Sequence, residues 1–311
     1  MTGQSVTSRL QQSRIRLGRR VPNLYVWTTI LPVLILVAAF TLYPFGFAAS
    51  VSLRKYILTQ PNSHPFVGLR NYSQVIGDEV FATSATNTLI FTLASVPLVT
   101  LLGLGVALLL NHPLRGFGVL RALVLLPWAI PLVSAGIMWK LILHGQFGAL
   151  SGLLFQFGLI KDYIPWLSDP SLAMLSVVFA HLWREFPLPA ILFLAGLQNI
   201  PPELYDAAKV DGAGVWARFW SVTLPLLSAP LLIIVIYETM IGIAVFDMVY
   251  VLTGGGPGSA TMLISWFAYT ATFKFLNLGQ GAALSFIIAI ALAGLIILYL
   301  RVLPTEEETT S

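Results

Sequence analysis

Six long apolar stretches, separated by polar segments, dominate the pattern of this chain. They cover residues 25–51, 85–111, 120–143, 172–197, 224–252 and 281–303. Each is long enough to cross a hydrocarbon core of roughly 30 Å as a helix, which needs about 20 mostly apolar residues. A helix satisfies its own backbone hydrogen bonds in lipid, and the short alternating segments of a membrane β-barrel do not occur. The pattern predicts an all-α transmembrane protein with six helices.

The composition agrees with a membrane protein. Apolar residues make up 57% of the chain and charged residues 10%, whereas soluble domains are about 45–50% apolar and about 25% charged. The absence of cysteine excludes a disulfide scaffold, a thiolate metal site and a cysteine nucleophile. The four histidines are scattered and form no HExxH motif, which argues against a catalytic metal.

The positions of Lys and Arg predict the orientation, because cytoplasmic loops of membrane proteins are enriched in these residues. Residues 1–24 are basic and contain no acid, and the apolar run after them is longer than the h-region of a signal peptide. We therefore interpret residues 25–303 as one transmembrane domain that begins with an uncleaved helix. With the N-terminus inside, the cytoplasmic basic residues are Arg9, Arg14, Arg16, Arg19, Arg20, Arg115, Arg121, Lys209, Arg218 and Arg301. The outer ones are Arg54, Lys55, Arg70, Lys140, Lys161 and Lys274. Both termini, including the acidic tail 304–311, are predicted to be cytoplasmic.

The segment between the fourth and fifth stretches, residues 198–225, is more than a connection. Pro202 opens a short predicted helix, with Asp206 in its first half. Gly212 and Gly214 are expected to end this helix, because glycine accepts the positive φ of a sharp turn. A second helix follows with an aromatic stripe formed by Trp216, Phe219 and Trp220. From these residues alone, the hairpin either lies on the lipid headgroups or docks a partner protein.

A run of motif residues resolves this choice by resemblance. The residues are Asp206-Ala207-Ala208, Asp211-Gly212-Ala213, Phe219 and Leu224-Pro225. Together they resemble the EAA loop of binding-protein-dependent ABC importer permeases. The first residue of this motif is Glu in the family and Asp206 here, which keeps the charge but shortens its reach.

Further blocks resemble the carbohydrate branch of that family, the maltose and glycerol-3-phosphate type. They are Phe246-Asp247 with Val251 to Pro257 (VLTGGGP), Phe66-Val67-Gly68-Leu69 with Asn71-Tyr72, Leu126-Pro127, and Ala195-Gly196-Leu197-Gln198 with Ile200-Pro201. The resemblance covers nearly the whole chain. The extra N-terminal helices and large outer domain of some maltose-type members are absent from this sequence.

The resemblance implies that the hairpin couples the permease to an ATPase subunit. Asp206 would be a charged contact to the ATPase, and Gly212 would be the hinge of the hairpin. The implied ATPase-coupling residues are Asp206, Ala207, Ala208, Asp211, Gly212, Ala213 and Phe219. The implied partners are a second homologous permease subunit, two ATP-binding subunits that hold ATP and Mg, an extracytoplasmic solute-binding protein and membrane lipid, with no nucleic acid.

The chain carries no ATPase motif of its own. The phosphate-binding pattern GxxxxGK[ST] needs a Gly-Lys pair, and the sequence contains none. Gly254–Gly256 has no Lys after it in register, and Gly103 with Gly105 is interpreted as a helix-packing pair. The chain is therefore predicted to be a transport subunit without bound cofactor, and not an enzyme.

Ionisable residues inside the predicted spans are costly in lipid and indicate a cavity or a partner. Helical spacing places the predicted substrate-binding residues on shared faces: His181, Arg184, Glu185 and Leu188 in the fourth stretch, and Glu238, Gly242 and Val245 in the fifth. Trp128 joins them from the third stretch, after Leu126-Pro127. Either Arg184 pairs with Glu185 or Glu238 and only stabilises the bundle, or these faces line a translocation cavity. The resemblance implies the cavity, and Arg with two Glu favours a neutral sugar or polyol.

The sequence thus predicts a permease subunit of an ATP-driven, binding-protein-dependent sugar importer in a bacterial or archaeal cytoplasmic membrane. The alternative is a stand-alone secondary transporter or channel that uses Glu238 or Asp247 as an ion site. Such carriers commonly show repeated halves, and no internal repeat is evident here. Within a permease, Asp247 either caps the TGGGP loop, which is favoured, or guides the substrate.

The first prediction concerns the hinge of the hairpin. Gly212→Asp should leave membrane insertion intact but prevent ATPase docking or uncouple transport, because a side chain at a positive φ distorts the turn. Membrane fractionation, co-purification with the ATPase and solute uptake measure these properties. Normal transport by this variant would contradict the coupling role.

Overall fold

The computed structural model describes residues 23–60, 64–112 and 117–302. Within these ranges the chain consists of helices and loops, with two isolated β-bridges. The described residues belong to two compact units, which divide in the sequence between Ser50 and Val51. Most of the basic segment 1–24 and all of the acidic tail 304–311 lie outside the described residues, as does Arg115.

The first unit contains a single apolar helical span. It comprises α1 (Asn23–Val37), a π-helical turn η1 (Ala38–Leu42) and most of α2 (Tyr43–Ser52). A span of 23 residues, Ile30–Ser52, is long and apolar enough to cross a membrane. Large apolar side chains such as Phe40, which is 77% exposed, cover its surface. The first predicted span is confirmed as a helix, with a π-helical turn inside it.

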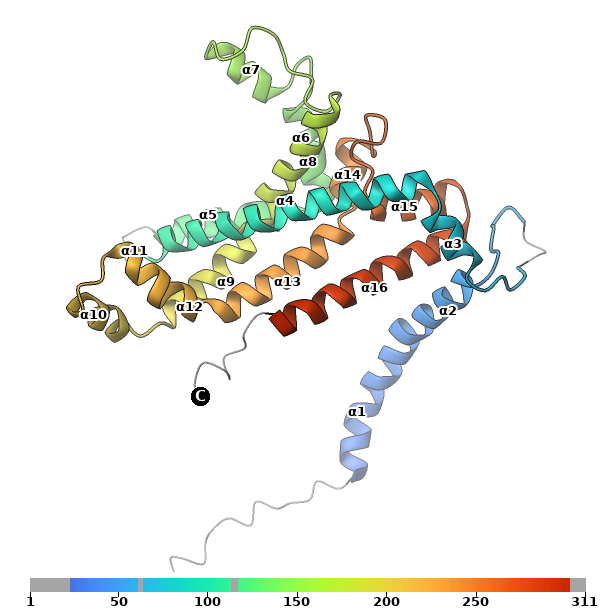
Figure 1. Cartoon of the computed structure of the whole chain (residues 1–311), viewed down its shortest axis with the longest axis horizontal. Helices are drawn as coiled ribbons and strands as arrows, with labels where there is room; N and C mark the ends of the chain where they lie inside the picture. Colours follow the sequence, from blue (N-terminus) through green and yellow to red (C-terminus); the bar gives the residue numbers. More distant parts are fainter. Residues whose placement is uncertain (1–22, 61–63, 113–116, 303–311) are drawn as a thin grey trace, which may run out of the picture. The chain divides into compact units, whose positions relative to one another are not determined.

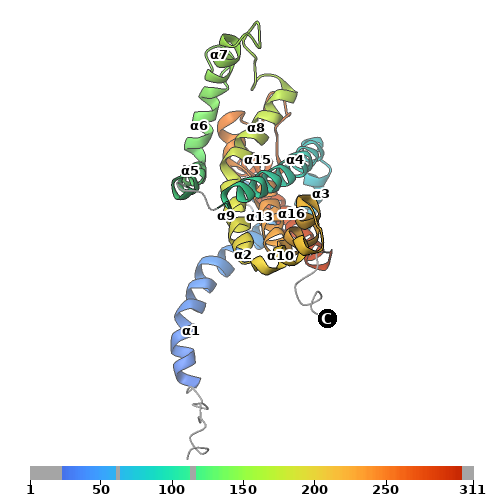
Figure 2. The same cartoon turned by 90° about the vertical axis from the view of Figure 1, so that its left-hand side faces the viewer.

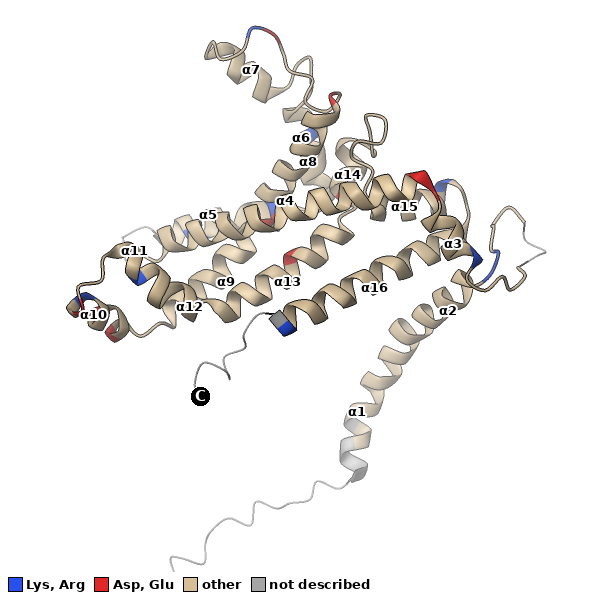
Figure 3. Cartoon of the chain, in the orientation of Figure 1, with Lys and Arg blue, Asp and Glu red and all other residues tan. Residues whose placement is uncertain are grey.

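The second unit is built around three long helical spans. These are α4 (Glu79–Leu110), α13 (Ser228–Ala244) continued by α14 (Asp247–Leu252), and α16 (Leu278–Val302). Helix α4 packs against α13, and α13 packs against α16 (Figure 1). Most charged residues lie in loops and at helix ends, and few lie within the long helices (Figure 3). This distribution fits helices whose middle parts lie in lipid.

Two of the predicted spans are bent pairs of helices instead of continuous helices. The third comprises α5 (Phe117–Ala129) and α6 (Leu132–Ile142), which meet at 93° (Figure 2). Pro131 has an extended ψ of 138° and lacks the N–H that would continue the helix. The fourth comprises α8 (Pro170–Glu185) and α9 (Pro187–Gln198), bent by 43°. Counting each bent pair as one span gives up to six spans among the described residues.

The fifth predicted helix is interrupted near both ends. At one end, α12 (Leu224–Leu226) stops before α13 begins at Ser228. At the other end, Val245 has an extended conformation, with φ −57° and ψ 127°, and separates α13 from α14. The hydroxyl of Ser265 donates a hydrogen bond to the Val245 carbonyl, which the break releases from the helix. The apolar run in the sequence did not reveal these breaks.

Short helices lie at both ends of the second unit. One end carries α3 (Arg70–Ile76), α15 (Ile264–Tyr269) and the π-helical turn η3 (Thr270–Lys274), while α7 (Ala149–Gln156) follows α6 away from the long helices (Figure 1). The other end carries α10 (Pro202–Val210), α11 (Val215–Arg218), the π-helical turn η2 (Phe219–Thr223) and α12 (Figure 1).

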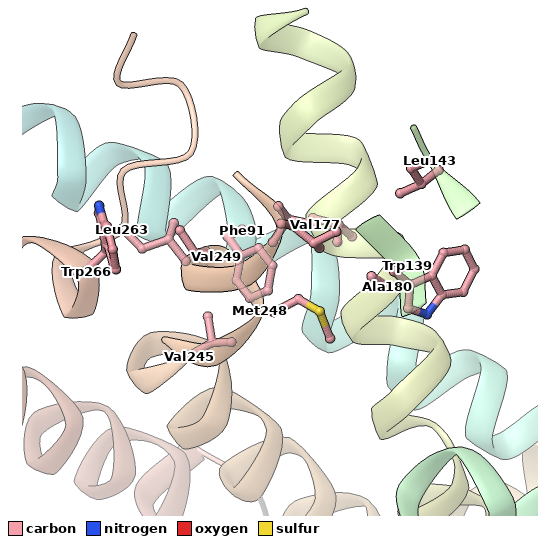
Figure 4. Close-up of a cluster of buried hydrophobic side chains, with 12 residues drawn as sticks. Phe91, Trp139, Leu143, Val177, Ala180, Val245, Met248, Val249, Leu263 and Trp266 are labelled. Atoms are coloured by element: carbon pink, nitrogen blue, oxygen red, sulfur yellow. The ribbon is translucent and has the colours of Figure 1, made fainter. Parts of the chain in front are cut away.

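A buried apolar cluster joins α4, α6, α8, α14 and α15. Its members include Phe91, Trp139, Val177, Met248 and Trp266, each at most 8% exposed (Figure 4). A second cluster joins α4 and α9 near the opposite end. These two clusters fix the distance between α4 and the bent helices α8 and α9, because packed side chains leave little freedom for sliding.

Gly103 allows α4 and α9 to approach closely. A Cβ atom at Gly103 would lie 2.6 Å from the Cβ of Pro189 and 3.1 Å from the nitrogen of Ala190. The interpretation of Gly103 with Gly105 as a packing pair is therefore half right. Gly105 is exposed, and no atom outside its own helix backbone lies within 4 Å of a Cβ placed there.

The second prediction uses this difference between the two glycines. Gly103→Ala should destabilise the protein by about 1–3 kcal/mol, because α4 and α9 must move apart. Gly105→Ala is the matched control and should leave stability unchanged or slightly raised, because alanine favours the helix. Thermal unfolding of the detergent-purified subunit measures both. Equal shifts for the two variants would contradict this packing role.

Candidate functional site

A group of ionisable side chains is buried between the helices of the second unit. His181 and Glu185 on α8 are 2% and 1% exposed, and Glu238 on α13 is 1% exposed. The Arg184 side chain is 15% exposed. Glu238 lies within electrostatic range of both Arg184 and Glu185. The structure therefore brings together the charged residues that the sequence placed on two separate helices.

Arg184 pairs with Glu185, its neighbour on the same helix. This pair joins adjacent residues of one helix, so it does not by itself link α8 to another helix. The pair also leaves hydrogen-bonding atoms unused: Arg184 Nε and Glu185 Oε2 are buried without a partner among the described residues. Both carboxylate oxygens of Glu238 and Nε2 of His181 are in the same condition.

Unpaired polar atoms of this kind are unusual in a protein interior. A buried donor or acceptor that loses its water partners costs about 1–3 kcal/mol, and more if it is charged. A cluster of them on two helices therefore indicates a place where a polar ligand or water supplies the missing hydrogen bonds. All four residues in this cluster are ionisable, and hydrogen bonds to their charged forms would be charge-assisted.

The remaining predicted substrate-binding residues fall in different surroundings. Gly242 is buried on α13, one turn from Glu238. Leu188 lies on α9, beyond the bend after α8, so the predicted face does not continue along one helix. Val245 ends α13, and its side chain packs in the apolar cluster with Met248 and Val249 (Figure 4). Trp128 is 41% exposed near the end of α5.

Hydroxyl groups on α4 were missed by the sequence analysis. Thr92, Ser95 and Thr100 are at most 8% exposed, and their hydroxyls have no hydrogen-bond partner among the described residues. The buried indole nitrogen of Trp139 on α6 also lacks a partner within the described part of the chain. The available signal was the recurrence of Ser and Thr at helical spacing in a long apolar stretch.

The hairpin at the other end of the unit forms largely as predicted. Pro202 occupies the first turn of α10, and Gly212 follows this helix with a φ of +77°. Gly214 differs from the prediction, because its φ of −67° and ψ of 176° are ordinary extended values. The turn therefore depends on Gly212, while Gly214 only precedes α11. The predicted second helix contains the π-helical turn η2.

The hairpin presents an exposed surface of mixed character. Asp206 and Lys209 on α10 form an exposed ion pair at 2.7 Å. Trp216 and Trp220 are 76% and 62% exposed, and each ring contacts Phe219 edge to face. The predicted coupling residues Ala207, Asp211 and Gly212 are exposed, while Ala208, Ala213 and Phe219 are half-buried. Exposed apolar side chains grouped in this way are typical of a surface that binds a partner protein or lipid.

Two threonines organise the TGGGP loop. The hydroxyls of Thr253 and Thr261 lie 2.7 Å apart, and Thr261 also donates to the Gly256 carbonyl at 2.7 Å. Asn87 of α4 donates to the carbonyls of Ser259 and Met262, which ties the loop to that helix. Asp247 is instead half-buried in the first turn of α14. The loop-capping role suggested for Asp247 therefore belongs to Thr253 and Thr261.

Residues 85–303, more than half of the chain, match the family model described as a binding-protein-dependent transport system inner membrane component. The chain belongs to this family. It is therefore a multi-pass membrane permease subunit, and a stand-alone secondary transporter or channel is not favoured.

Curated relatives match over most of their length. The trehalose/maltose transport system permease protein MalF of Thermococcus litoralis is 40% identical over 301 residues, which cover 96% of this chain and 97% of the relative. The sulfoquinovosyl glycerol transport system permease protein SmoG of Agrobacterium fabrum is 34% identical, with 89% of each chain covered. The trehalose transport system permease protein SugA of Mycobacterium tuberculosis is 36% identical, with 83% of this chain and 81% of the relative covered.

Solved structures share the fold of this binding-protein-dependent permease. A bacterial ABC transporter involved in the import of the acidic polysaccharide alginate gives a TM-score of 0.77 at 20% identity, with 90% of this chain and 94% of that chain covered. The alginate transporter in complex with an alginate pentasaccharide-bound periplasmic protein also gives 0.77, at 19% identity, with 89% and 93% covered. The arrangement of bent and straight spans in this permease is therefore a known fold.

The third prediction compares the two ion pairs of the permease. Arg184→Met should destabilise it by on the order of 3 kcal/mol, because Glu185 is left buried without its cation. Lys209→Met is the matched control, and removal of its exposed pair with Asp206 should cost no more than about 1 kcal/mol. Thermal unfolding in detergent measures the difference. A larger loss in the Lys209 variant would show that the burial of the first pair has no energetic weight.

Proposed function

We propose that the chain is the permease subunit of an ATP-driven sugar importer and that its buried ionisable group binds the sugar during passage. The observation that carries the proposal is this group: acids, a base and an imidazole, buried among apolar helices, with hydrogen-bonding atoms left unpaired among the described residues. A sugar hydroxyl both donates and accepts, so one ligand can satisfy atoms of both kinds. The names of the relatives, which refer to trehalose, maltose and sulfoquinovosyl glycerol, support the same class of solute.

The proposed site residues have distinct roles. Glu238 and Glu185 accept hydrogen bonds from sugar hydroxyls, and Arg184 donates hydrogen bonds to sugar hydroxyls. His181 donates or accepts according to its tautomer, and Gly242 leaves space beside Glu238. The site has Arg with two Glu and no surplus of positive charge, so a neutral sugar or polyol suits it better than a phosphorylated one.

The hairpin is proposed as the contact to a separate ATPase subunit. Its exposed first helix carries Asp206 and the small residues Ala207 and Ala208, which allow another protein to approach closely. The positive φ of Gly212 sets the sharp turn between the two short helices. ATP and Mg would bind to the partner, since the chain contains no Gly-Lys pair. Movement of the ATPase would then bias the permease between two conformations.

The proposed assembly contains a second homologous permease, two ATP-binding subunits and an extracytoplasmic solute-binding protein. The hairpin would lie in the cytoplasm with both termini, and the end with α3 and α15 would receive the solute-binding protein. Lys and Arg are more frequent in the segments predicted to lie on the same side of the membrane as the hairpin, which supports this orientation.

The fourth prediction tests the function and the site in one assay. The complete complex in proteoliposomes should import the sugar that its binding protein recognises, and only with ATP present. Glu238→Gln should lower the uptake rate about tenfold or more, because it removes a charge-assisted hydrogen bond worth roughly 1.5–3 kcal/mol. Uptake of labelled sugar and co-purification of all subunits are the measurements.

Glu79→Gln is the matched control, since Glu79 is an exposed carboxylate in the first turn of α4. It should transport at the parental rate. Parental uptake by Glu238→Gln, and also by Arg184→Gln, would support a purely structural role for the buried group. Sugar movement by this chain with no nucleotide and no companion subunits would refute the proposed function itself.

A further inference from the structure

A stripe of hydroxyl side chains runs along the buried face of α4. It consists of Ser84, Thr88, Thr92, Ser95 and Thr100, each at most 8% exposed. Thr100, five residues after Ser95, lies about 140° further round the helix, whereas spacings of three and four residues keep the other four on one side. This is the side that packs against the other helices of the second unit, including α8 and α13.

The members of the stripe fall into two classes. Thr88 is fully used: its hydroxyl donates to the Ser84 carbonyl at 2.7 Å and accepts from the Ile264 amide at 2.9 Å. Thr92 and Ser95 are equally buried, but their hydroxyls have no partner among the described residues. A helical Ser or Thr can bond the carbonyl four residues earlier, as Thr88 does. Within the described structure, Thr92 and Ser95 leave this local bond unmade.

The unpaired hydroxyls face the candidate site. A Cβ atom at Gly242 would lie 3.4 Å from Thr92 Oγ1 and 3.7 Å from Ser95 Oγ. Gly242 is one helical turn from Glu238, whose two carboxylate oxygens are also unpaired within the described chain. At the neighbouring position of α4, the ring of Phe91 packs edge to face on the ring of His181, with 5.1 Å between the ring centroids. Thr92 and Ser95 thus lie against α13 beside Gly242, while the neighbouring Phe91 contacts His181 of α8.

Space is available next to one of these hydroxyls, that of Thr92. Thr92 lines a cavity of about 410 Å³ between α4, α13 and α16, together with Thr239 and Tyr299, whereas Ser95 and Glu238 do not line it. The hydroxyls of Thr239 and Tyr299 already bond to each other at 3.1 Å. Binding sites for small molecules commonly have this volume and a mostly apolar wall with a few polar groups.

We propose that Thr92 and Ser95 form hydrogen bonds to the transported solute, a neutral polyhydroxyl compound, as it passes Glu238. This inference rests on the proposed function and extends its site to a third helix. Each hydroxyl donates one hydrogen bond and accepts up to two, so it matches a sugar hydroxyl in either direction. Hydroxyls on α4 therefore supply groups that donate and accept opposite Glu238 on α13.

The double variant Thr92→Val/Ser95→Ala tests the proposal in the reconstituted complex. The transport rate at saturating binding protein should fall about tenfold, as expected for the loss of two hydrogen bonds. The melting temperature of the permease should not fall, because no hydrogen bond within the described protein is removed. Thr88→Val is the matched control with the opposite pattern: lower melting temperature, and parental transport per folded complex.

A single cysteine provides a direct test of contact with the solute. The chain has no cysteine, so Ser95→Cys introduces one thiol with little change in size. A hydrophilic methanethiosulfonate reagent should label this thiol during ATP turnover, and excess sugar with its binding protein should slow the labelling several-fold. Thr86→Cys, at an exposed position on the same helix, should be labelled at the same rate with and without sugar.

The outcomes separate this inference from the proposed function. Parental transport by Thr92→Val/Ser95→Ala, or labelling of Ser95→Cys that sugar does not slow, overturns the role of α4 while the parent complex still imports sugar. A parent complex that imports no sugar refutes the proposed function, and this inference with it.

Discussion

The structure depends on one constraint: inside a membrane, every polar group needs a partner from the protein or its ligand. Helices meet this requirement for the backbone, and most side chains in the long spans are apolar. The exceptions lie together. Glu238, His181, Thr92 and Ser95 come from three helices, and each keeps a buried atom unpaired among the described residues. Burial of polar atoms without hydrogen bonds costs free energy, and a polar solute that crosses the membrane can offset this cost by forming those bonds. The lipid supplies no hydrogen-bond partners, so the polar groups of the site remain available for a solute.

The bent helices place this group. Helix α8 carries His181 and the ion pair of Arg184 with Glu185 at its C-terminal end, immediately before the bend at Phe186. Pro187 begins α9, which packs on α4 through Gly103. In a straight helix, Leu188 would lie on the same face as His181 and Glu185. Because of the bend, the ionisable residues lie at a junction between two helices, where backbone irregularity is tolerated in membrane proteins if it is buried or lines a cavity.

The hairpin and the buried group have different physical designs, in keeping with their different proposed roles. The hairpin is exposed, and its one ion pair, between Asp206 and Lys209, lies in contact with solvent. Its geometry depends on the left-handed conformation of Gly212. The buried group instead depends on close packing, since α4 and α13 approach at Gly242. A conformational change started by an ATPase would have to pass from the hairpin to the buried group through α9 and α13. These helices pack on each other and on α4.

By itself, the sequence determined the helical class, the six apolar stretches and the position of the hairpin, because membrane thickness sets span length and Pro202 and Gly212 act through local backbone geometry. It also identified the residues of the buried group, since charged residues in apolar runs stand out. Only the tertiary structure decided how spans three, four and five break, because proline can kink, end or begin a helix according to its packing. It alone showed that Val245 belongs to the apolar core, that Gly103 packs and Gly105 does not, and that hydroxyls of α4 face Gly242. These features depend on which helix lies opposite, and a pattern along one chain carries no information about that neighbour.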